Sequence, residues 1–93
     1  MRSIILRLED RIQISERIRD IRVNAELLQY EFGECLGVER MTVYNWENWA
    51  QLPSMKIIRK MAQEFHTTPQ WILYGSDEKW MNNLVTTQLS QLT

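Results

Sequence analysis

Cysteine, histidine and long apolar runs are scarce in this sequence, and each scarcity argues against a class of protein. The single cysteine, Cys35, rules out an internal disulfide framework and fits a reducing compartment. No stretch approaches the roughly 20 apolar residues that a membrane-spanning helix needs. The acidic pair Glu9 and Asp10 stands where a secretory signal would continue apolar. We therefore expect a cytoplasmic protein with no membrane segment.

The side-chain sets that enzymes use are also missing from the sequence. With one cysteine and one histidine, the chain has no nucleophile–base set and no metal-ligand cluster, and it shows no phosphate loop. His66 ends a predicted helix, where a helix-end cation or polar cap is favoured over a metal ligand. Cys35 neighbours the predicted core residue Leu36, which favours a small, partly buried thiol over a redox switch. The sequence predicts no enzyme, no cofactor, no metal and no small-molecule substrate.

Glycine and proline are few, and they fall at the predicted ends of helices or at their crossing point. The 93 residues make one domain, with 44% hydrophobic and 25% charged residues as in ordinary globular proteins. Gly37 and Gly75 each end an apolar periodic segment, and Pro69 opens one. Three polar residues are expected helix caps, namely Ser15, Ser54 and Thr68. The result is an all-α bundle with helices over about 15–23, 28–36, 40–48, 55–65 and 69–74.

The two ends of the chain leave alternatives open. Residues 1–14 alternate side chains as a short strand would, yet Ile5, Leu8 and Ile12 also fit a helix. Residues 76–93 repeat apolar side chains at three- and four-residue intervals. This C-terminal segment is either a partly ordered tail on its own core or an amphipathic arm that pairs two protomers. Trp49 and Trp80 are further candidates for a protomer contact.

Residues 29–48, QYEFGECLGVERMTVYNWEN, carry the most specific pattern in the chain. Gly33 has no side chain at the point where a second helix would approach. Gly37 falls three residues before the next helical pattern, where the chain has to reverse. Because these residues recur at the spacings that two crossing helices need, the pattern predicts a helix-turn-helix, whose second helix enters the DNA major groove. The inward-facing set is Phe32, Leu36, Val38, Val43 and Trp46.

The charge distribution argues against strong nonspecific binding to DNA. Residues 1–22 and 54–75 each carry a net charge of +2, whereas residues 23–53 have one arginine against five glutamates. The predicted DNA-reading unit is thus the most acidic part of the chain. Because phosphate repels this charge, affinity has to depend on a few contacts, on helix-end amides and on dimerisation.

Five segments match a known family in its order and spacing, namely RIRDIR, QYEFGECLGV, VYNWEN, LPSMKIIRKMAQEF and TPQWILYG. Over residues 15–75, about two-thirds of the chain, the sequence resembles the lambda-repressor/Cro-like helix-turn-helix family, also called the XRE family. The resemblance implies a compact five-helix bundle and a phage-type or bacterial transcription regulator that binds operator DNA as a dimer. The expected organisation is an N-terminal extension (1–14), a DNA-binding domain (15–75) and a C-terminal tail (76–93) that is a possible dimerisation segment.

Two residues depart from the family pattern. Leu28 stands where Ser or Thr is usual, which removes a helix cap worth about 1 kcal/mol. Trp49 follows the W-E-N triplet where Gly is common, and its side chain disfavours a left-handed turn, so we expect the loop after it to take a different path. The resemblance also suggests that Glu47 pairs with Arg17 and so fixes the third helix against the first. Arg22 is expected on a solvated face.

The third predicted helix carries the candidate base contacts, because Val43 and Trp46 turn inward and leave its other face outside. Arginine pairs with guanine through two donors, and asparagine pairs with adenine. Methionine can touch a thymine methyl group, and tyrosine can reach a base edge or a phosphate. The alternative is a helix face that is only solvated. The candidates are Arg40, Met41, Tyr44 and Asn45.

Candidate phosphate contacts lie mainly at helix ends. Gln29 opens the second predicted helix, where its side chain and a backbone amide can meet one phosphate. Thr42 lies between the exposed and buried faces of the third helix. Asn48 matches a family position that binds the DNA backbone. For Gln29 and Asn48, the alternative is an ordinary helix-end polar residue.

Two classes of function fit these observations. The first is a sequence-specific DNA-binding regulator that acts by occupying promoter DNA. The second is a protein-interaction module of the same fold, antitoxin-like or an anti-regulator, with weak or no DNA binding. The acidic residues of segment 23–53 and an exposed Trp49 favour the second class.

Overall fold

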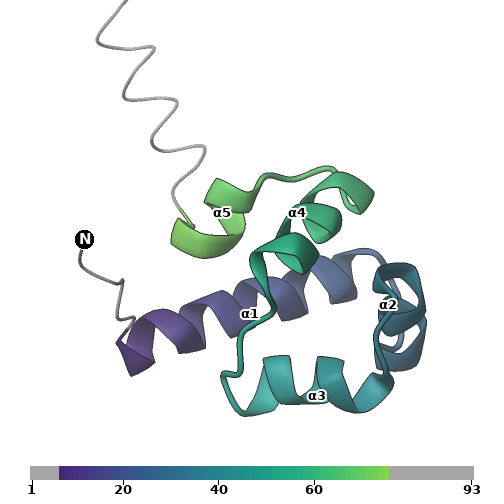
Figure 1. The fold of residues 1–93 in the computed structure, drawn as a ribbon, viewed down its shortest axis with the longest axis horizontal. Coiled ribbons are helices and arrows are strands. Elements are labelled where there is room, and N and C mark those ends of the chain that lie inside the picture. Colours follow the sequence, from purple (N-terminus) through teal and green to yellow (C-terminus); the bar gives the residue numbers. More distant parts are fainter. Residues whose placement is uncertain (1–6, 76–93) are drawn as a thin grey trace, which may run out of the picture.

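The computed structural model describes residues 7–75, which form helices joined by short turns (Figure 1). No strand occurs within this range, so the predicted all-α bundle is confirmed for it. The predictions for the C-terminal tail, including Trp80, lie outside the described residues, as does the alternation of residues 3–6. The helices are α1 (Leu8–Asn24), α2 (Gln29–Leu36), α3 (Arg40–Asn48), α4 (Met55–Glu64) and α5 (Pro69–Tyr74).

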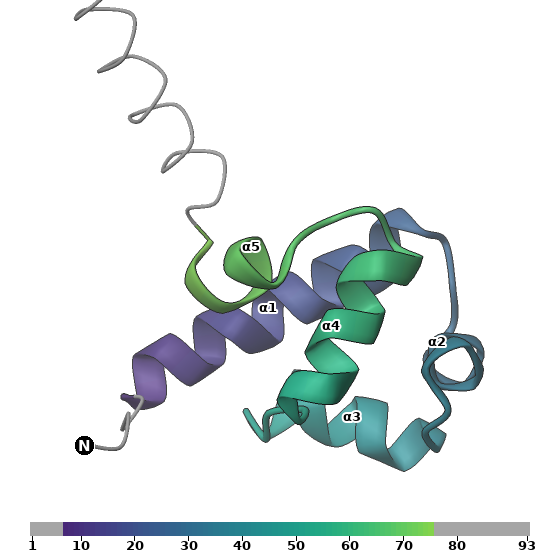
Figure 2. The same cartoon turned by 45° about the horizontal axis from the view of Figure 1, so that its top comes forward.

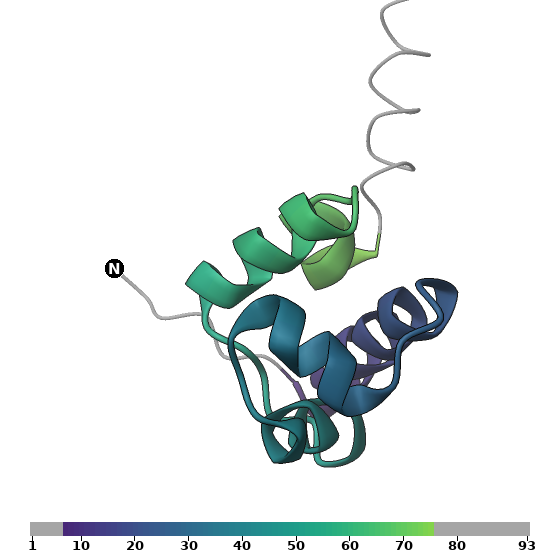
Figure 3. The same ribbon diagram turned by 90° about the vertical axis from the view of Figure 1, so that its right-hand side faces the viewer.

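The helix α1 runs through the middle of the molecule, with α3 on one side and α4 and α5 on the other (Figures 1 and 3). It packs against both α3 and α5, while α2 bridges α3 and α4. Within residues 7–75, no helix has the length and apolar character that crossing a membrane requires. The side chains that are almost fully buried come from all five helices, and they are Ile14, Ile18, Phe32, Leu36, Val43, Ile58, Met61 and Ile72.

The first helix begins at Leu8, seven residues before the predicted start. Glu9 and Asp10 lie in its first turn, where the helix dipole favours negative charge. The prediction that Ser15 caps this helix is wrong, because Ser15 lies in the interior of α1 on the same buried face as Ile14 and Ile18. The predicted boundary between residues 14 and 15 therefore falls inside a continuous helix.

Ser15 is a buried polar residue whose hydroxyl group has no hydrogen-bond partner among the described residues. A buried unsatisfied hydroxyl costs free energy, and alanine is also the better helix former. We therefore expect Ser15→Ala to raise the free energy of unfolding by about 1 kcal/mol, measured by urea denaturation of both proteins. A lower midpoint for the variant, at an unchanged slope, would show that the hydroxyl group stabilises the core.

The turn between α2 and α3 depends on two glycines. Gly37 ends α2 in the predicted left-handed conformation, with a φ of 76°. The amide of Val38 donates to the carbonyl oxygen of Gly33 at 2.9 Å, which brings the two residues into direct contact. A Cβ atom on Gly33 would lie 2.5 Å from the Val38 carbonyl oxygen, so only glycine fits there without a shift of the backbone. Gly33 thus makes room for the turn that leads into α3.

The predicted caps of the last two helices are confirmed. The hydroxyl oxygen of Ser54 accepts from the amide of Ile57, and that of Thr68 accepts from the amide of Trp71. Pro69 occupies the first turn of α5, and Gly75 ends that helix with a φ of 63°. The α4 helix turns its apolar side to the core, where the rings of Phe65 and Phe32 stand 5.1 Å apart.

Candidate nucleic-acid interface

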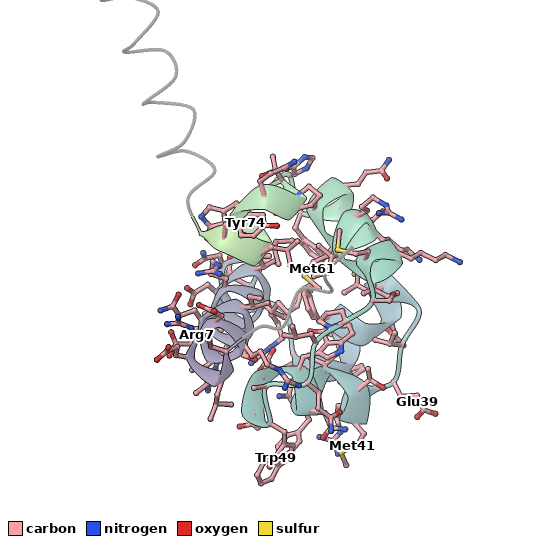
Figure 4. The ribbon with its side chains drawn as sticks, turned by 60° about the vertical axis from the view of Figure 1, so that its left-hand side comes forward. Arg7, Glu39, Met41, Trp49, Met61 and Tyr74 are labelled. Carbon is pink, nitrogen blue, oxygen red and sulfur yellow. The ribbon has the colours of Figure 1, made fainter. Side chains whose placement is uncertain are left out.

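The outward face of α3 lies at an outer edge of the molecule, away from α4 and α5 (Figures 1 and 3). Val43 and Trp46 turn inward and are buried, as predicted. Arg40 and Met41 are exposed, whereas Tyr44 and Asn45 are half-buried. Figure 4 shows Met41 pointing away from the body of the protein. The four candidate base contacts therefore differ in how far they stand out from the helix.

A buried ion pair fixes α3 against α1, although its arginine is not the predicted one. Arg22 donates from Nε to one carboxylate oxygen of Glu47 at 2.7 Å and from Nη2 to the other at 3.0 Å. The side chains of Arg22 and Glu47 are 13% and 1% exposed. Gln29 donates from Nε2 to the same carboxylate at 3.1 Å. Residues from α1, α2 and α3 thus meet at one carboxylate, and Arg22 is not on a solvated face.

Arg17 was predicted to pair with Glu47, and this prediction is wrong. Five residues separate Arg17 from Arg22, which turns their side chains about 140° apart around α1. Arg17 therefore faces α5, where it donates to the carbonyl oxygens of Ile72 at 2.7 Å and Leu73 at 3.0 Å. Partial burial lowers the pKa of the Arg17 guanidinium, while Glu16 and Asp10 act in the opposite direction. The cation satisfies carbonyl groups at the C-terminal end of α5, where the helix dipole favours positive charge.

The first turn of α2 has backbone amides without a side-chain cap, as expected for the departure at Leu28. The carboxylate of Glu31 accepts from the amide of Leu28 at 2.8 Å and so satisfies the residue before the helix. The side chain of Gln29 is half-buried, and one of its two amide hydrogens points to Glu47. The first-turn N–H groups of α2 are therefore directed outward beside a side chain that the ion pair holds in place.

Thr42 and Asn48, the two further candidates on α3, lie in its first and last turns. Asn48 is exposed and donates from Nδ2 to the carbonyl oxygen of Tyr44 at 3.0 Å, which orients its amide along the helix. Thr42 is half-buried between the inner and outer faces of α3, as predicted. Figure 2 shows α2 nearly end-on beside α3, so that the two helices run in different directions. The three candidate phosphate contacts therefore lie on two helices, Gln29 on α2 and both Thr42 and Asn48 on α3.

Trp49 does not take the left-handed conformation, as its bulky side chain predicted. Trp49 has a φ of −118°, and the left-handed conformation falls instead on Ala50, with a φ of 55°. Ala50 is buried, whereas Trp49 is 65% exposed. The chain therefore turns back into the protein directly after Trp49 and leaves the indole outside.

Residues 23–53 present less negative charge at the surface than their five glutamates suggest. Glu47 is buried and neutralised by Arg22. Glu31 is bound to the amide of Leu28 at the start of its own helix. Glu26, Glu34 and Glu39 remain exposed, and Glu39 stands directly before Arg40. The outward face of α3 thus repels phosphate less than the sequence alone indicated.

Cys35 and His66 are the single cysteine and the single histidine of the chain, and they lie on different parts of the fold, Cys35 on α2 and His66 after α4. Cys35 is exposed, so the prediction of a partly buried thiol is wrong, because the inner face of α2 is filled by Phe32, Gly33 and Leu36. His66 follows α4 in a left-handed conformation, with a φ of 59°. Among residues 7–75, no three side chains of the metal-ligating kind gather at one point.

Arg22 is the residue that the sequence analysis missed. A signal for it exists in the spacing, because Ile14, Ile18 and Arg22 follow one another at intervals of four residues. Arg22 therefore lies on the same side of α1 as the buried Ile14 and Ile18, and its side chain faces α3 and not the solvent.

Known proteins are similar to this chain in sequence. The helix-turn-helix family model matches residues 18–72, more than half of the chain. The HTH-type transcriptional regulator DicA of Escherichia coli (strain K12) is 29% identical over 68 residues, which are 73% of this chain and 50% of that protein. The chain therefore spans about half the length of this curated relative.

Solved structures of known proteins have a similar fold. The P22 c2 repressor protein, in complex with synthetic operator 9T, has a TM-score of 0.62 at 24% identity, over 67% of this chain and 94% of that chain. The hypothetical transcription factor NHTF from Neisseria has a TM-score of 0.65 at 22% identity, over 87% of this chain and 94% of that chain. At these identities the likeness shows the fold. The family model, which matches more than half of the chain, shows that the chain belongs to the helix-turn-helix family.

Proposed function

We propose that this protein is a DNA-binding transcription regulator, which binds operator DNA as a homodimer with α3 in the major groove. One observation carries the proposal, namely an outward face of α3 that the buried Arg22–Glu47 pair fixes against the rest of the fold. Since a fixed helix needs little ordering when it binds, its side chains can discriminate between bases. Such a regulator acts in the cytoplasm, where bacterial DNA lies.

The base contacts belong to four residues of α3. Arg40 offers two donors to a guanine, and Asn45 offers a donor and an acceptor to an adenine. Met41, whose side chain is 51% exposed, suits contact with a thymine methyl group. Tyr44 reaches a base edge or a phosphate with its hydroxyl group. Arg40 and Met41 are more exposed than Tyr44 and Asn45, which supports a first contact of these two side chains with the DNA.

The phosphate contacts belong to Gln29, Thr42 and Asn48. The uncapped amides at the start of α2 suit a phosphate oxygen, and the remaining amide hydrogen of Gln29 can share it. Asn48 keeps one amide hydrogen free beside its bond to Tyr44. Thr42 offers a hydroxyl group on the side of α3 that faces the groove wall. These groups fix the register of α3 and carry no base specificity of their own.

Dimerisation follows from the amount of sequence that one helix can read. A single recognition helix contacts only about four or five base pairs, which is too few to define a unique site in a genome. Two copies placed about one helical turn of DNA apart would read a near-palindrome. Each protomer then contributes the same contacts to one half-site.

A protein-interaction module with the same fold is the second candidate. The exposed side chains of Glu34, Glu39 and Trp49 favour it, since they offer acidic and apolar groups to a protein partner. This module would be antitoxin-like or an anti-regulator, and it would not depend on Arg40 or Asn45.

The salt dependence of DNA binding separates the two candidates. A regulator that displaces counterions from phosphates should lose affinity for its duplex between 50 and 200 mM salt, by roughly 3- to 4-fold for each phosphate that it neutralises. The measurement is a titration of labelled duplex by fluorescence anisotropy at several salt concentrations. Absence of binding to any duplex at micromolar protein and low salt would instead support the interaction module.

A further inference from the structure

Trp49 extends the outward face of α3 beyond the end of the helix. Its position follows Met41 by eight residues and Asn45 by four, so the three side chains share one face. Figure 4 shows Trp49 and Met41 projecting from the same edge of the protein. The indole is 65% exposed, which is more than the side chain of Met41. A large apolar side chain thus stands at the C-terminal rim of the candidate interface.

Hydrogen bonds and a buried neighbour fix the main chain at Trp49. The amide of Trp49 donates to the carbonyl oxygen of Asn45 at 3.0 Å, and the amide of Gln51 donates to the same oxygen at 3.4 Å. Ala50 is buried and takes the left-handed conformation, so the chain is anchored on both sides of the indole. The exposed indole therefore belongs to an ordered end of α3.

The charge of the neighbouring segment suits the approach of a phosphate backbone. Residues 40–63 contain a single acidic residue, Glu47, which is buried and paired with Arg22. The exposed Glu39 lies at the opposite end of α3, ten residues from Trp49. Residues 40–63 thus carry no exposed carboxylate, and the side chains that they present at the C-terminal end of α3 are apolar or neutral polar groups.

We propose that the indole of Trp49 contacts DNA directly and packs against the sugar–phosphate backbone at the edge of the groove that α3 occupies. The flat ring can cover a deoxyribose, and its Nε1–H can donate to a phosphate oxygen. A glycine, which is common at this position in the family, supplies neither contact. This contact rests on the proposed function, because it exists only when α3 lies in a DNA groove.

The test compares the affinity of the full chain and its variants for a duplex selected by the wild-type protein. Burial of about 60 Å² of apolar indole surface corresponds to about tenfold in Kd. Trp49→Ala should therefore weaken binding by about tenfold or more, and Trp49→Phe should restore most of the affinity. Because the indole is uncharged, the slope of log Kd against log salt should not change. Tyr74→Ala is the matched control, since Tyr74 is 64% exposed on α5, and it should bind as the wild type does.

Sedimentation of each protein without DNA separates a DNA contact from a contact between protomers. The proposal requires Trp49→Ala to keep the wild-type self-association while its operator affinity falls. Unchanged operator affinity of Trp49→Ala would overturn it while leaving the proposed function intact. A loss of affinity matched by an equal loss of self-association would place the indole between two copies of the chain and also overturn it. Failure of the wild-type protein to bind any duplex would remove the proposed function and this contact together.

Discussion

Replacement of Glu47 by alanine is expected to destabilise the protein by about 3–5 kcal/mol. Glu47 accepts two hydrogen bonds from Arg22 and one from Gln29, and its side chain is 1% exposed. Its removal leaves the Arg22 guanidinium, which is 13% exposed and also donates from Nη1 to the carbonyl oxygen of Leu27 at 2.9 Å, without a counter-charge. A loss of this size is a large part of the stability of a small domain, so chemical denaturation should show a much lower midpoint.

The control for this prediction is Glu34→Ala, which removes an exposed carboxylate from α2. Its effect should stay within about 0.5 kcal/mol. A double variant, Arg22→Met with Glu47→Leu, should cost less than Glu47→Ala alone, because it leaves no buried charge behind. A loss below about 1 kcal/mol for Glu47→Ala would show that the pair does not hold α3 against α1.

Arg40→Ala and Asn45→Ala are each expected to lose specificity at one base position of the operator. A good bidentate contact discriminates by about 1–3 kcal/mol, so each variant should lose roughly 5- to 150-fold in preference at its own position. Arg40 is exposed, and the hydrogen bonds of Asn45 to Trp49 and Gln51 use its backbone, so neither change should disturb the fold. Binding measured against operators mutated one base pair at a time gives the two preferences.

Arg59→Ala is the matched control, since it removes an exposed arginine from α4, on the other side of the molecule. It should leave the preference at every base position unchanged. If Arg40→Ala and Asn45→Ala weaken binding to all sequences equally, these residues contact phosphate and the assignment of base contacts is wrong.

Local features of the fold were predictable from the sequence because short-range chemistry sets them. The left-handed turn at Gly37 and the caps Ser54 and Thr68 each depend on residues within a few positions. The bounds of α3 follow from the turn before it and the inward pair Val43 and Trp46. These features predicted which side of α3 faces the core, and Val43 and Trp46 are buried there.

Features that depend on how helices rotate against each other were not predictable in the same way. Arg17 and Arg22 lie on one helix, and only the packing of α1 decides which of them faces Glu47. Ser15 looked like a helix cap because an uncompensated buried hydroxyl is not expected in a core. The first helix was predicted to begin at about Ser15, yet it extends back to Leu8. In each case, tertiary packing overrode a local preference.

Selection of bound duplexes from a random pool is the measurement that tests the proposed function most directly. The full chain should enrich one near-palindrome, whose half-sites lie about one helical turn of DNA apart. The same selection with Arg40→Ala and Asn45→Ala should lose the preference at two distinct positions of each half-site. Enrichment of no sequence, at low salt and micromolar protein, would contradict the placement of α3 in a DNA groove.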